Sequence, residues 1–137
     1  MLVQTLDGKK YQWKIPEKLS KGNKRAPSAG HTTTRNILQQ LYPMCGIYEE
    51  IPIVVEGRKK LFLDFYIPTI QQAIEVHGRQ HYEYIPFYHR DKLQFLMSKA
   101  NDRKKQEWCE LNSITLIILP FNESEEEWIS RLQLKIN

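Results

Sequence analysis

The sequence predicts a mixed α/β fold, in which a central mixed sheet is flanked by helices and preceded by an N-terminal β-hairpin. One observation is the order of segments, which reads hairpin, helix, three strands, helix, strand, helix along 137 residues. Another is the short, almost wholly apolar run at residues 114–119, which is typical of a strand buried on both faces. The third is the length, which suits one domain with a sizeable core.

The hairpin is predicted from Asp7-Gly8, a strong turn signal between two alternating segments in residues 3–15. Three apolar side chains fall on one face of its second strand: Tyr11, Trp13 and Ile15. The segment after it is either an arm that grips phosphates or a plain connector, and its basic residues are Lys18, Lys21, Lys24 and Arg25. We assign residues 1–27 to this hairpin and basic loop, and residues 28–137 to a single domain.

The first helix is predicted to begin after Ser28, a favourable N-cap, and to end near Tyr42 because Pro43 follows. Apolar runs bounded by turn residues then predict three strands, at residues 47–55, about 60–67 and 72–77. The loop that follows, residues 78–90, is dense in Tyr, Phe, His and Arg. Its rings either stack on nucleobases or fold inward on one another.

Asp91 or a near neighbour opens a long helix to about Leu111, which is either unbroken or interrupted near residues 98–102. Its apolar residues at helical spacing are Leu93, Leu96, Ala100, Trp108 and Leu111. After the strand at 114–119, residues 122–136 predict a closing helix with acids in its first turn. The three tryptophans are expected in the core: Trp13, Trp108 and Trp128.

The charge of the chain is divided along its length. The net charge is +4, but residues 1–105 hold 18 basic and 10 acidic residues, whereas residues 106–137 hold 2 and 6. The first part is therefore a basic body at +8, and the second an acidic tail at −4. Clustered basic charge is the footprint of a polyanion partner, although a solvated surface has the same composition.

Composition also indicates a cytoplasmic protein. The chain has no apolar run of 18 residues, so we expect no membrane span. The N-terminal residues are too polar and too few for a signal peptide. The only cysteines, Cys45 and Cys109, are far apart and are expected to be free thiols in a reducing compartment.

Two apolar strands each carry one carboxylate, Asp64 in residues 61–67 and Glu75 in residues 73–76. A buried acid is costly unless it is paired, hydrogen-bonded or bound to a metal ion. These two can sit side by side on neighbouring strands, where they repel unless a cation lies between them or one takes up a proton. Hard oxygen ligands favour Mg²⁺ or Mn²⁺. The pattern therefore suits metal-assisted phosphodiester hydrolysis.

These residues resemble the PD-(D/E)XK nuclease superfamily, and within it the very short patch repair endonucleases and related small phage and homing endonucleases. The run Asp64-Phe65-Tyr66-Ile67-Pro68 resembles the first metal-binding strand, Glu75 the second acid, and Gly78-Arg79-Gln80-His81-Tyr82 the tail after it. Asn101-Asp102-Arg103-Lys104-Lys105 resembles a further helix motif. The likeness covers residues 28–120 and implies a restriction-endonuclease-like fold.

The resemblance also implies residue roles. Asp64, Glu75 and the backbone carbonyl of Val76 would bind the metal ion. His81 would handle the proton with the support of Asp102, or each would make only local contacts. The implied catalytic residues are Asp64, Glu75, His77, Gln80, His81 and Asp102. From their own charge and position, rather than from the resemblance, the expected DNA-binding residues are Lys18, Lys21, Lys24, Arg25, Arg79 and Lys105. The likeness to phage endonucleases implies a bacterial or phage-infected cell.

The chain departs from the superfamily pattern at two positions. His77 stands where Lys is usual, and it acts either as a base or as a packing residue beside the site. His31 stands where the first helix usually bears Glu. Glu49 or Glu50 would supply that missing acid, unless both are solvated charges at a strand edge.

The expected function is that of a metal-dependent DNA endonuclease, either a nicking enzyme or a structure- or site-selective one. Its partners would be DNA and either a second copy of the chain or a larger protein. One alternative is a DNA-binding module that kept the nuclease fold without its activity. The other is an interaction subunit of a phage or transposon complex that docks through the acidic tail. Fold alone does not decide among them.

Overall fold

The structure is a computed structural model that describes residues 1–15 and 28–133. It confirms the mixed α/β class, with a four-stranded mixed sheet, three helices and an N-terminal antiparallel hairpin in this part of the chain. Four of the basic residues expected to bind DNA lie outside the described residues: Lys18, Lys21, Lys24 and Arg25. No helix in the described part is long and apolar enough to span a bilayer.

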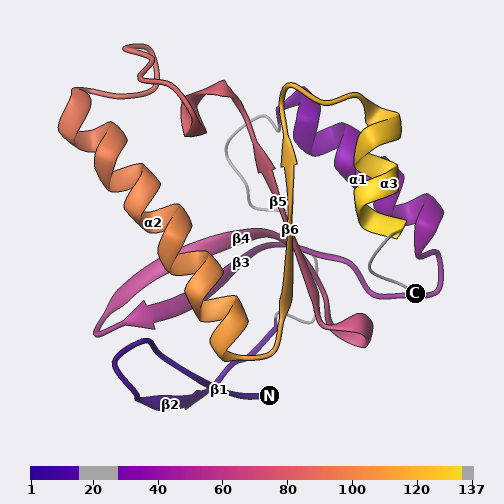
Figure 1. Ribbon diagram of the computed structural model, residues 1–137. Coiled ribbons are helices and arrows are strands. Elements are labelled where there is room, and N and C mark those ends of the chain that lie inside the picture. Colours follow the sequence, from indigo (N-terminus) through magenta and orange to yellow (C-terminus); the bar gives the residue numbers. More distant parts are fainter. Residues whose placement is uncertain (16–27, 134–137) are drawn as a thin grey trace.

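The elements follow the predicted order (Figure 1). The strands are β1 (Leu2–Gln4), β2 (Lys10–Gln12), β3 (Tyr48–Glu56), β4 (Lys59–Ile67), β5 (Gln72–His77) and β6 (Thr115–Pro120). The α-helices are α1 (Ala29–Leu41), α2 (Lys92–Leu111) and α3 (Glu125–Gln133), and the 3₁₀ turns are η1 (Pro68–Ile70) and η2 (Arg79–His81). The main sheet has the order β3-β4-β5-β6, antiparallel except for the parallel pair β5–β6.

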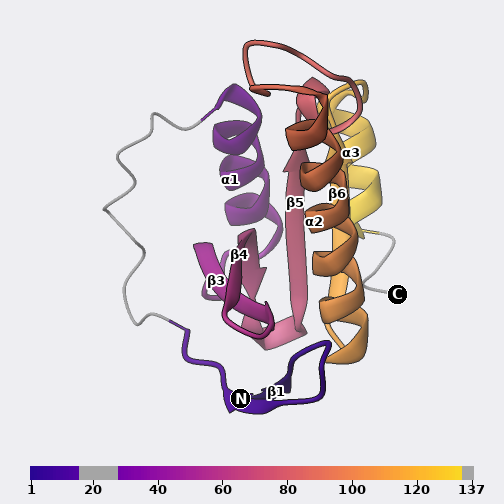
Figure 2. The same cartoon turned by 90° about the vertical axis from the view of Figure 1, so that its left-hand side faces the viewer.

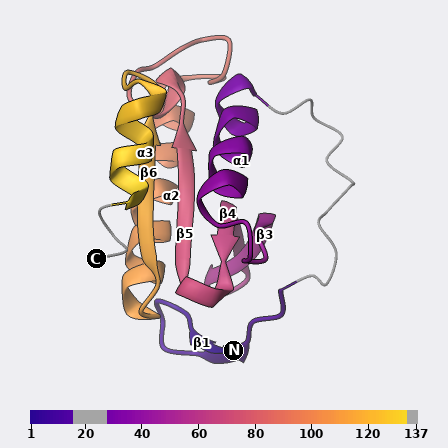
Figure 3. The same ribbon diagram turned by 90° about the vertical axis from the view of Figure 1, so that its right-hand side faces the viewer.

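The helices cover the sheet on both faces and form three layers. Helix α2 lies over one face (Figure 2), and α1 and α3 lie over the other (Figure 3). The α2 side holds one core cluster, around Trp108, Ile53 and Leu63. The opposite side holds a second cluster, around Leu38, Phe65 and Trp128. Because α2 connects β5 to its parallel neighbour β6, the chain reverses direction beside the C-terminal end of β5.

The predicted helix starts are confirmed in atomic detail. The Ser28 hydroxyl accepts a hydrogen bond from the backbone N–H of His31 at 3.1 Å, and the Asp91 carboxylate accepts one from that of Gln94 at 2.8 Å. Each satisfies a donor that the first helical turn leaves unpaired. Helix α2 runs for 20 residues without interruption.

The apolar spacing of α2 does not mark a buried face along its whole length. Leu93, Leu96 and Leu111 are 66%, 60% and 46% exposed, and Trp108 is fully buried. Ala100 is exposed as well. The first turns of α2 stand away from the strands in Figure 1, so side chains there have no sheet to pack against. Helical periodicity identifies a face but not the extent of its partner.

The N-terminal hairpin shares the core of the sheet. The ring of Trp13 lies 4.7 Å from that of Tyr66 and 5.2 Å from that of Trp108. Val3 is also buried in this cluster. At the hairpin turn Gly8 has a φ of 88°, a left-handed conformation that favours glycine. Residues 1–15 are thus packed as part of the same body as the sheet they adjoin.

The inward-facing side chains of β4 switch from one face of the sheet to the other at Asp64. Leu63 packs into the α2-side core and Phe65 into the opposite core, although residues two apart in a regular strand share a face. The ladder with β3 pairs Glu49 with Phe65 and Ile51 with Leu63 on either side of this point. Between them, Glu50 has a left-handed φ of 53°. Both strands are therefore distorted where the first predicted acid stands.

Candidate active site

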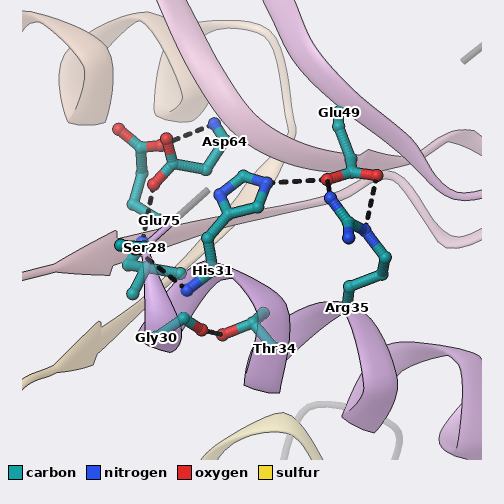
Figure 4. A network of polar contacts seen from close by, with 9 residues as sticks. Ser28, Gly30, His31, Thr34, Arg35, Glu49, Asp64 and Glu75 are labelled. Carbon is teal, nitrogen blue, oxygen red and sulfur yellow. Dashed lines mark hydrogen bonds and ion pairs between the residues drawn. The ribbon is translucent and has the colours of Figure 1, made fainter. Parts of the chain in front are cut away.

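The two predicted acids lie side by side, joined through backbone groups (Figure 4). The β4–β5 ladder ends at the pair Phe65–Ile74, so the next backbone N–H groups need other partners. Glu75 Oε2 accepts from the Asp64 N–H at 2.7 Å, and Asp64 Oδ2 accepts from the Val76 N–H at 2.8 Å. This reciprocal pair of hydrogen bonds holds both carboxylates at the centre of the sheet.

Glu75 is almost completely buried, with 2% of its surface exposed. Burial, and then the negative charge of Asp64, raise its pKa to about 8. Lys105 opposes this shift, because its Nζ lies 2.5 Å from Glu75 Oε1. Burial works against the charge of Lys105, but Glu75 nevertheless raises the pKa of that lysine above its ordinary value. The second acid thus has an ammonium group as its immediate counter-charge.

Lys105 contacts the acids themselves in this structure. We expected Lys105 to neutralise DNA phosphate, and the sequence places His77 where the superfamily usually has its lysine. The signal that indicates the orientation of Lys105 is its spacing in α2. Asp102, Lys105 and the buried Trp108 follow one another at three-residue intervals, so all three lie on the face that meets the sheet.

His81 and Asp102 are brought together as the resemblance implied. His81 Nδ1 lies 2.9 Å from Asp102 Oδ2. With Nδ1–H donating to the carboxylate, Nε2 is the nitrogen that carries the lone pair. The carboxylate also fixes the plane of the ring, so His81 is oriented before any substrate arrives.

His77 stacks on His81, with ring centroids 4.0 Å apart and planes 5° from parallel. His77 is 5% exposed, and burial, followed by the neighbouring His81, lowers its pKa to about 4. The ring is therefore neutral near pH 7. It lies on the same strand face as Glu75, two residues away, as the sequence predicts.

The remaining predicted residues lie on η2, just beyond β5. Arg79 Nε lies 3.0 Å from an Oε atom of Glu83, and both side chains are largely exposed. Gln80 packs over Gly78, where a Cβ atom would come within 2.5 Å of Gln80 Oε1. A side chain at position 78 would therefore displace the end of the flexible Gln80 side chain. The expected roles of Arg79 in DNA binding and of Gln80 in catalysis stay predictions.

A second network connects α1 to β3 (Figure 4). We expected Glu49 or Glu50 to supply the acid missing at His31, but the sequence did not indicate the part taken by Arg35. His31 Nε2 lies 2.6 Å from Glu49 Oε1, and Arg35 binds both oxygens of Glu49 at 2.7 and 2.9 Å. Burial alone would raise the pKa of Glu49, but the hydrogen bonds and charges of Arg35 and His31 outweigh burial and hold that pKa below its usual value. The His31 ring also stacks on Phe65 at 4.4 Å. The one available signal was the i, i+4 spacing of His31 and Arg35 on α1.

Within the described residues, two groups of side chains have the spacing of metal ligands. The donor atoms of His31, Glu50 and Asp64 all lie within 4.8 Å of one another. So do those of a second group, His77, His81 and Asp102. The first group adjoins Glu75 and combines carboxylate oxygens with one imidazole. This donor set fits a small divalent cation.

Comparison with known proteins finds relatives in viruses. No family model matches the chain, and no solved structure does. Uncharacterized protein 307L of Invertebrate iridescent virus 6 is 35% identical over 65 residues, which are 47% of this chain and 33% of that protein. Uncharacterized protein 033L of Invertebrate iridescent virus 3 is 34% identical over 61 residues, 44% of this chain and 31% of that protein.

A third relative is uncharacterized protein 094L of Frog virus 3 (isolate Goorha), 36% identical over 70 residues, 50% of this chain and 45% of that protein. The matches thus span less than half of the length of each of these relatives. Their names state no activity. This chain is therefore similar, over about half of its length, to segments of longer proteins from iridescent viruses and a frog virus.

Proposed function

We propose that this protein is a metal-dependent DNA endonuclease with a restriction-endonuclease-like sheet. The observation that carries the proposal is the hydrogen-bonded pair of Asp64 and Glu75 at the centre of the sheet. A protein that needed only stability would gain little from two adjacent acids there, because each carries a large desolvation cost. Together with Glu50 they number three carboxylates beside a single ammonium, that of Lys105.

Asp64, Glu75 and the carbonyl of Val76 would hold Mg²⁺ or Mn²⁺. When bound, the ion supplies Lewis acidity and lowers the pKa of a water molecule. The chain's own contribution is to fix the acids in place, since each carboxylate accepts a backbone N–H from the neighbouring strand. Lys105 and Arg79 supply positive charge for a phosphate group.

His81 serves as the proton acceptor in this proposal. Asp102 holds its Nδ1, so Nε2 can take a proton from the attacking water, and the flat contact with His77 keeps the ring from rotating. His77 itself is buried and neutral, which suits a supporting role. Asp102 stabilises the imidazolium that forms.

The proposed substrate is DNA, because the basic body and the exposed rings lie along the same part of the chain. Phe87 and Tyr88 are 88% and 57% exposed in the loop that follows η2. Lys92, Lys99 and Arg103 follow on α2. Exposed aromatic rings suit stacking on nucleobases, and positive charges beside them suit contacts with phosphates. The viral relatives favour an infected cell as the setting.

Incubation with supercoiled plasmid DNA tests this proposal directly. We expect nicked or linear DNA with Mg²⁺ or Mn²⁺ and none with EDTA. Asp64→Asn should abolish cleavage, and His81→Gln should reduce the rate by roughly 10²–10⁴-fold. The control is Glu126→Gln, which removes an exposed carboxylate on α3 and should cleave as the wild type does. A wild-type protein that binds DNA but never cleaves it, with either ion, would exclude the endonuclease.

One observation favours a second candidate, a DNA-binding module without activity. Lys105 lies against Glu75 as a counter-charge, and the sequence has His77 where the superfamily usually has its lysine. In that case the plasmid should be bound by the protein but not cleaved. The binding should be unchanged by EDTA and by Asp64→Asn.

A further inference from the structure

We propose that His31 and Glu50 complete a cation site with Asp64, and that this site prefers Mn²⁺ to Mg²⁺. The three donors come from three different elements, α1, β3 and β4, and converge to within 4.8 Å of one another. The inference shares Asp64 with the proposed endonuclease and so rests on it for the cation's purpose. It differs in naming two further ligands and the kind of metal ion.

His31 is held in the orientation that a metal ligand requires. It is 9% exposed, and its Nε2 faces Glu49, which Arg35 in turn grips with two hydrogen bonds. With Nε2–H donating to Glu49, the lone pair is on Nδ1. Figure 4 shows this second nitrogen on the side of the ring that faces Asp64. A carboxylate behind a histidine is the usual way in which proteins orient a metal-binding imidazole.

Glu50 occupies a backbone conformation that its residue type disfavours. Its φ of 53° suits glycine, and a glutamate there is strained. No salt bridge to its carboxylate is found among residues 1–15 and 28–133, although the neighbouring Glu49 is doubly paired. Strain of this kind concentrates at functional sites. Glycine would fit this backbone better, but it would leave no carboxylate at position 50 beside Asp64.

The charges around Asp64 leave room for one divalent cation. When ionised, the carboxylates of Asp64, Glu75 and Glu50 carry three negative charges, and Lys105 offsets one. Arg35 is committed to Glu49 and does not contribute. Two uncompensated charges in a half-buried setting match the charge of a single divalent ion.

The imidazole decides which ion is preferred. Mg²⁺ takes oxygen ligands almost exclusively and keeps much of its water, whereas imidazole nitrogen suits first-row transition metals. A set of two carboxylates and one imidazole therefore binds Mn²⁺ more tightly than Mg²⁺. Without the nitrogen, the same acids form an ordinary oxygen site.

The experiment is a titration of the full chain with Mn²⁺, followed by electron paramagnetic resonance of the free ion and by competition with Mg²⁺, without DNA. We expect one Mn²⁺ per chain and a weaker competition by Mg²⁺. His31→Gln should weaken Mn²⁺ binding by roughly 10–100-fold and narrow the preference over Mg²⁺. Glu50→Gly, which suits the backbone and should melt no lower than the wild type, should weaken the binding of both ions.

The matched control is Glu56→Gln, at the far end of β3, where Glu56 pairs with Lys104; it should bind Mn²⁺ normally. If Asp64→Asn abolishes binding but His31→Gln and Glu50→Gly both bind as the wild type does, the two added ligands are wrong and the cation of the proposed endonuclease survives. If Asp64→Asn also binds normally, both proposals lose their cation. Tighter binding of Mg²⁺ than of Mn²⁺ would overturn the stated preference.

Discussion

Glu75 shows most clearly how burial and charge act on one residue. Its carboxylate is enclosed, accepts the Asp64 N–H, and contacts the Lys105 ammonium. Asp64 carries a second negative charge next to it. The protein therefore stores an unfavourable charge arrangement in its metal-free form, and the folded state favours the protonated carboxyl group. A cation would relieve the same repulsion.

The stability of the metal-free protein should depend on the charge of Glu75. Its pKa is raised to about 8 in the folded state from an ordinary value of 4.5. Because the folded state binds the Glu75 proton more tightly than the unfolded state does, this proton stabilises the fold fully below the ordinary pKa of 4.5. That stabilisation is lost as the pH rises through the folded pKa of about 8. Between pH 5 and 8, wild type should therefore lose free energy of unfolding relative to Glu75→Gln, by at most about 1.4 kcal/mol per pH unit.

Urea denaturation at several pH values in EDTA measures this difference. The Gln side chain can still accept the Asp64 N–H, so the comparison isolates the titrating proton. A constant difference between the two proteins across this range would contradict the shifted pKa.

The elements matter because β5 and α2 are aligned residue by residue. Glu75 and His77, two residues apart, lie on the same face of β5. Lys105 and Asp102 lie one turn apart on α2: Lys105 contacts Glu75, and Asp102 contacts His81, which stacks on His77. The charge pair and the histidine pair are thus adjacent parts of one interface. Trp108, one turn further along α2, is fully buried in the core and anchors this alignment.

Removal of Lys105 should be costly unless its partner is removed too. Lys105→Met leaves Glu75 buried without its counter-charge, and breaking a buried pair typically costs about 3–5 kcal/mol. The double variant Lys105→Met/Glu75→Gln should recover most of that stability, because no unpaired charge remains. Chemical denaturation of the two single variants and the double variant, at a pH above the folded pKa of Glu75 of about 8, where the carboxylate is ionised, gives the coupling energy. If the double variant is as unstable as Lys105→Met alone, the pair is not what stabilises this interface.

Sequence cues predicted the elements well because these cues are local. Ser28 and Asp91 cap their helices, and Asp7-Gly8 forms the hairpin turn. The meeting of Asp64 and Glu75 could also be predicted, since neighbouring strands across a short turn pair antiparallel. The contact between Lys105 and Glu75 could not: the spacing of Lys105 and Trp108 indicates the face of α2 that meets the sheet, but not which residue of β5 lies opposite.

Glu49 was one of two residues expected to supply the acid missing at His31, but its contacts with His31 and Arg35 were missed for a related reason. These contacts join a helix to an edge strand that pairs with β4 alone in the main sheet, and nothing in either segment indicates which face of α1 meets which end of β3. Glu50 was ambiguous because an alternating pattern assumes a regular strand. The left-handed φ at this residue breaks the alternation, and no glycine marks the irregularity in the sequence.

At the scale of the whole molecule, a basic body and a compact three-layered core are combined in a short chain. DNA binding should therefore depend strongly on salt. If four to six basic groups contact phosphates, the logarithm of the association constant should fall with that of salt concentration at a slope of roughly −4 to −5. Fluorescence anisotropy of a labelled duplex between low and moderate salt measures the slope.

Replacement of Lys18, Lys21 and Lys24 by Ser tests the part that lies outside the described residues. If the basic loop grips phosphates, the slope should become shallower by up to about 3, one per lost contact. Replacement of Glu125 and Glu126 by Gln, on the acidic helix α3, serves as the contrasting variant and should leave the slope unchanged or steeper. A slope near zero for the intact chain would rule out a role in duplex binding.

The short ladder between β4 and β5 has a consequence for how such proteins can evolve. Only three residue pairs join these strands through the backbone, and beyond Phe65 the attachment passes through the carboxylates of Asp64 and Glu75. Main-chain hydrogen bonds survive most substitutions other than proline, whereas these two depend on the side chains at positions 64 and 75. A lineage that gave up its chemistry would still need acceptors at both positions, so asparagine and glutamine would be the replacements that its architecture tolerates. Retention of polar residues at 64 and 75 would then record ancestry of the fold, and only retention of both acids would record the activity.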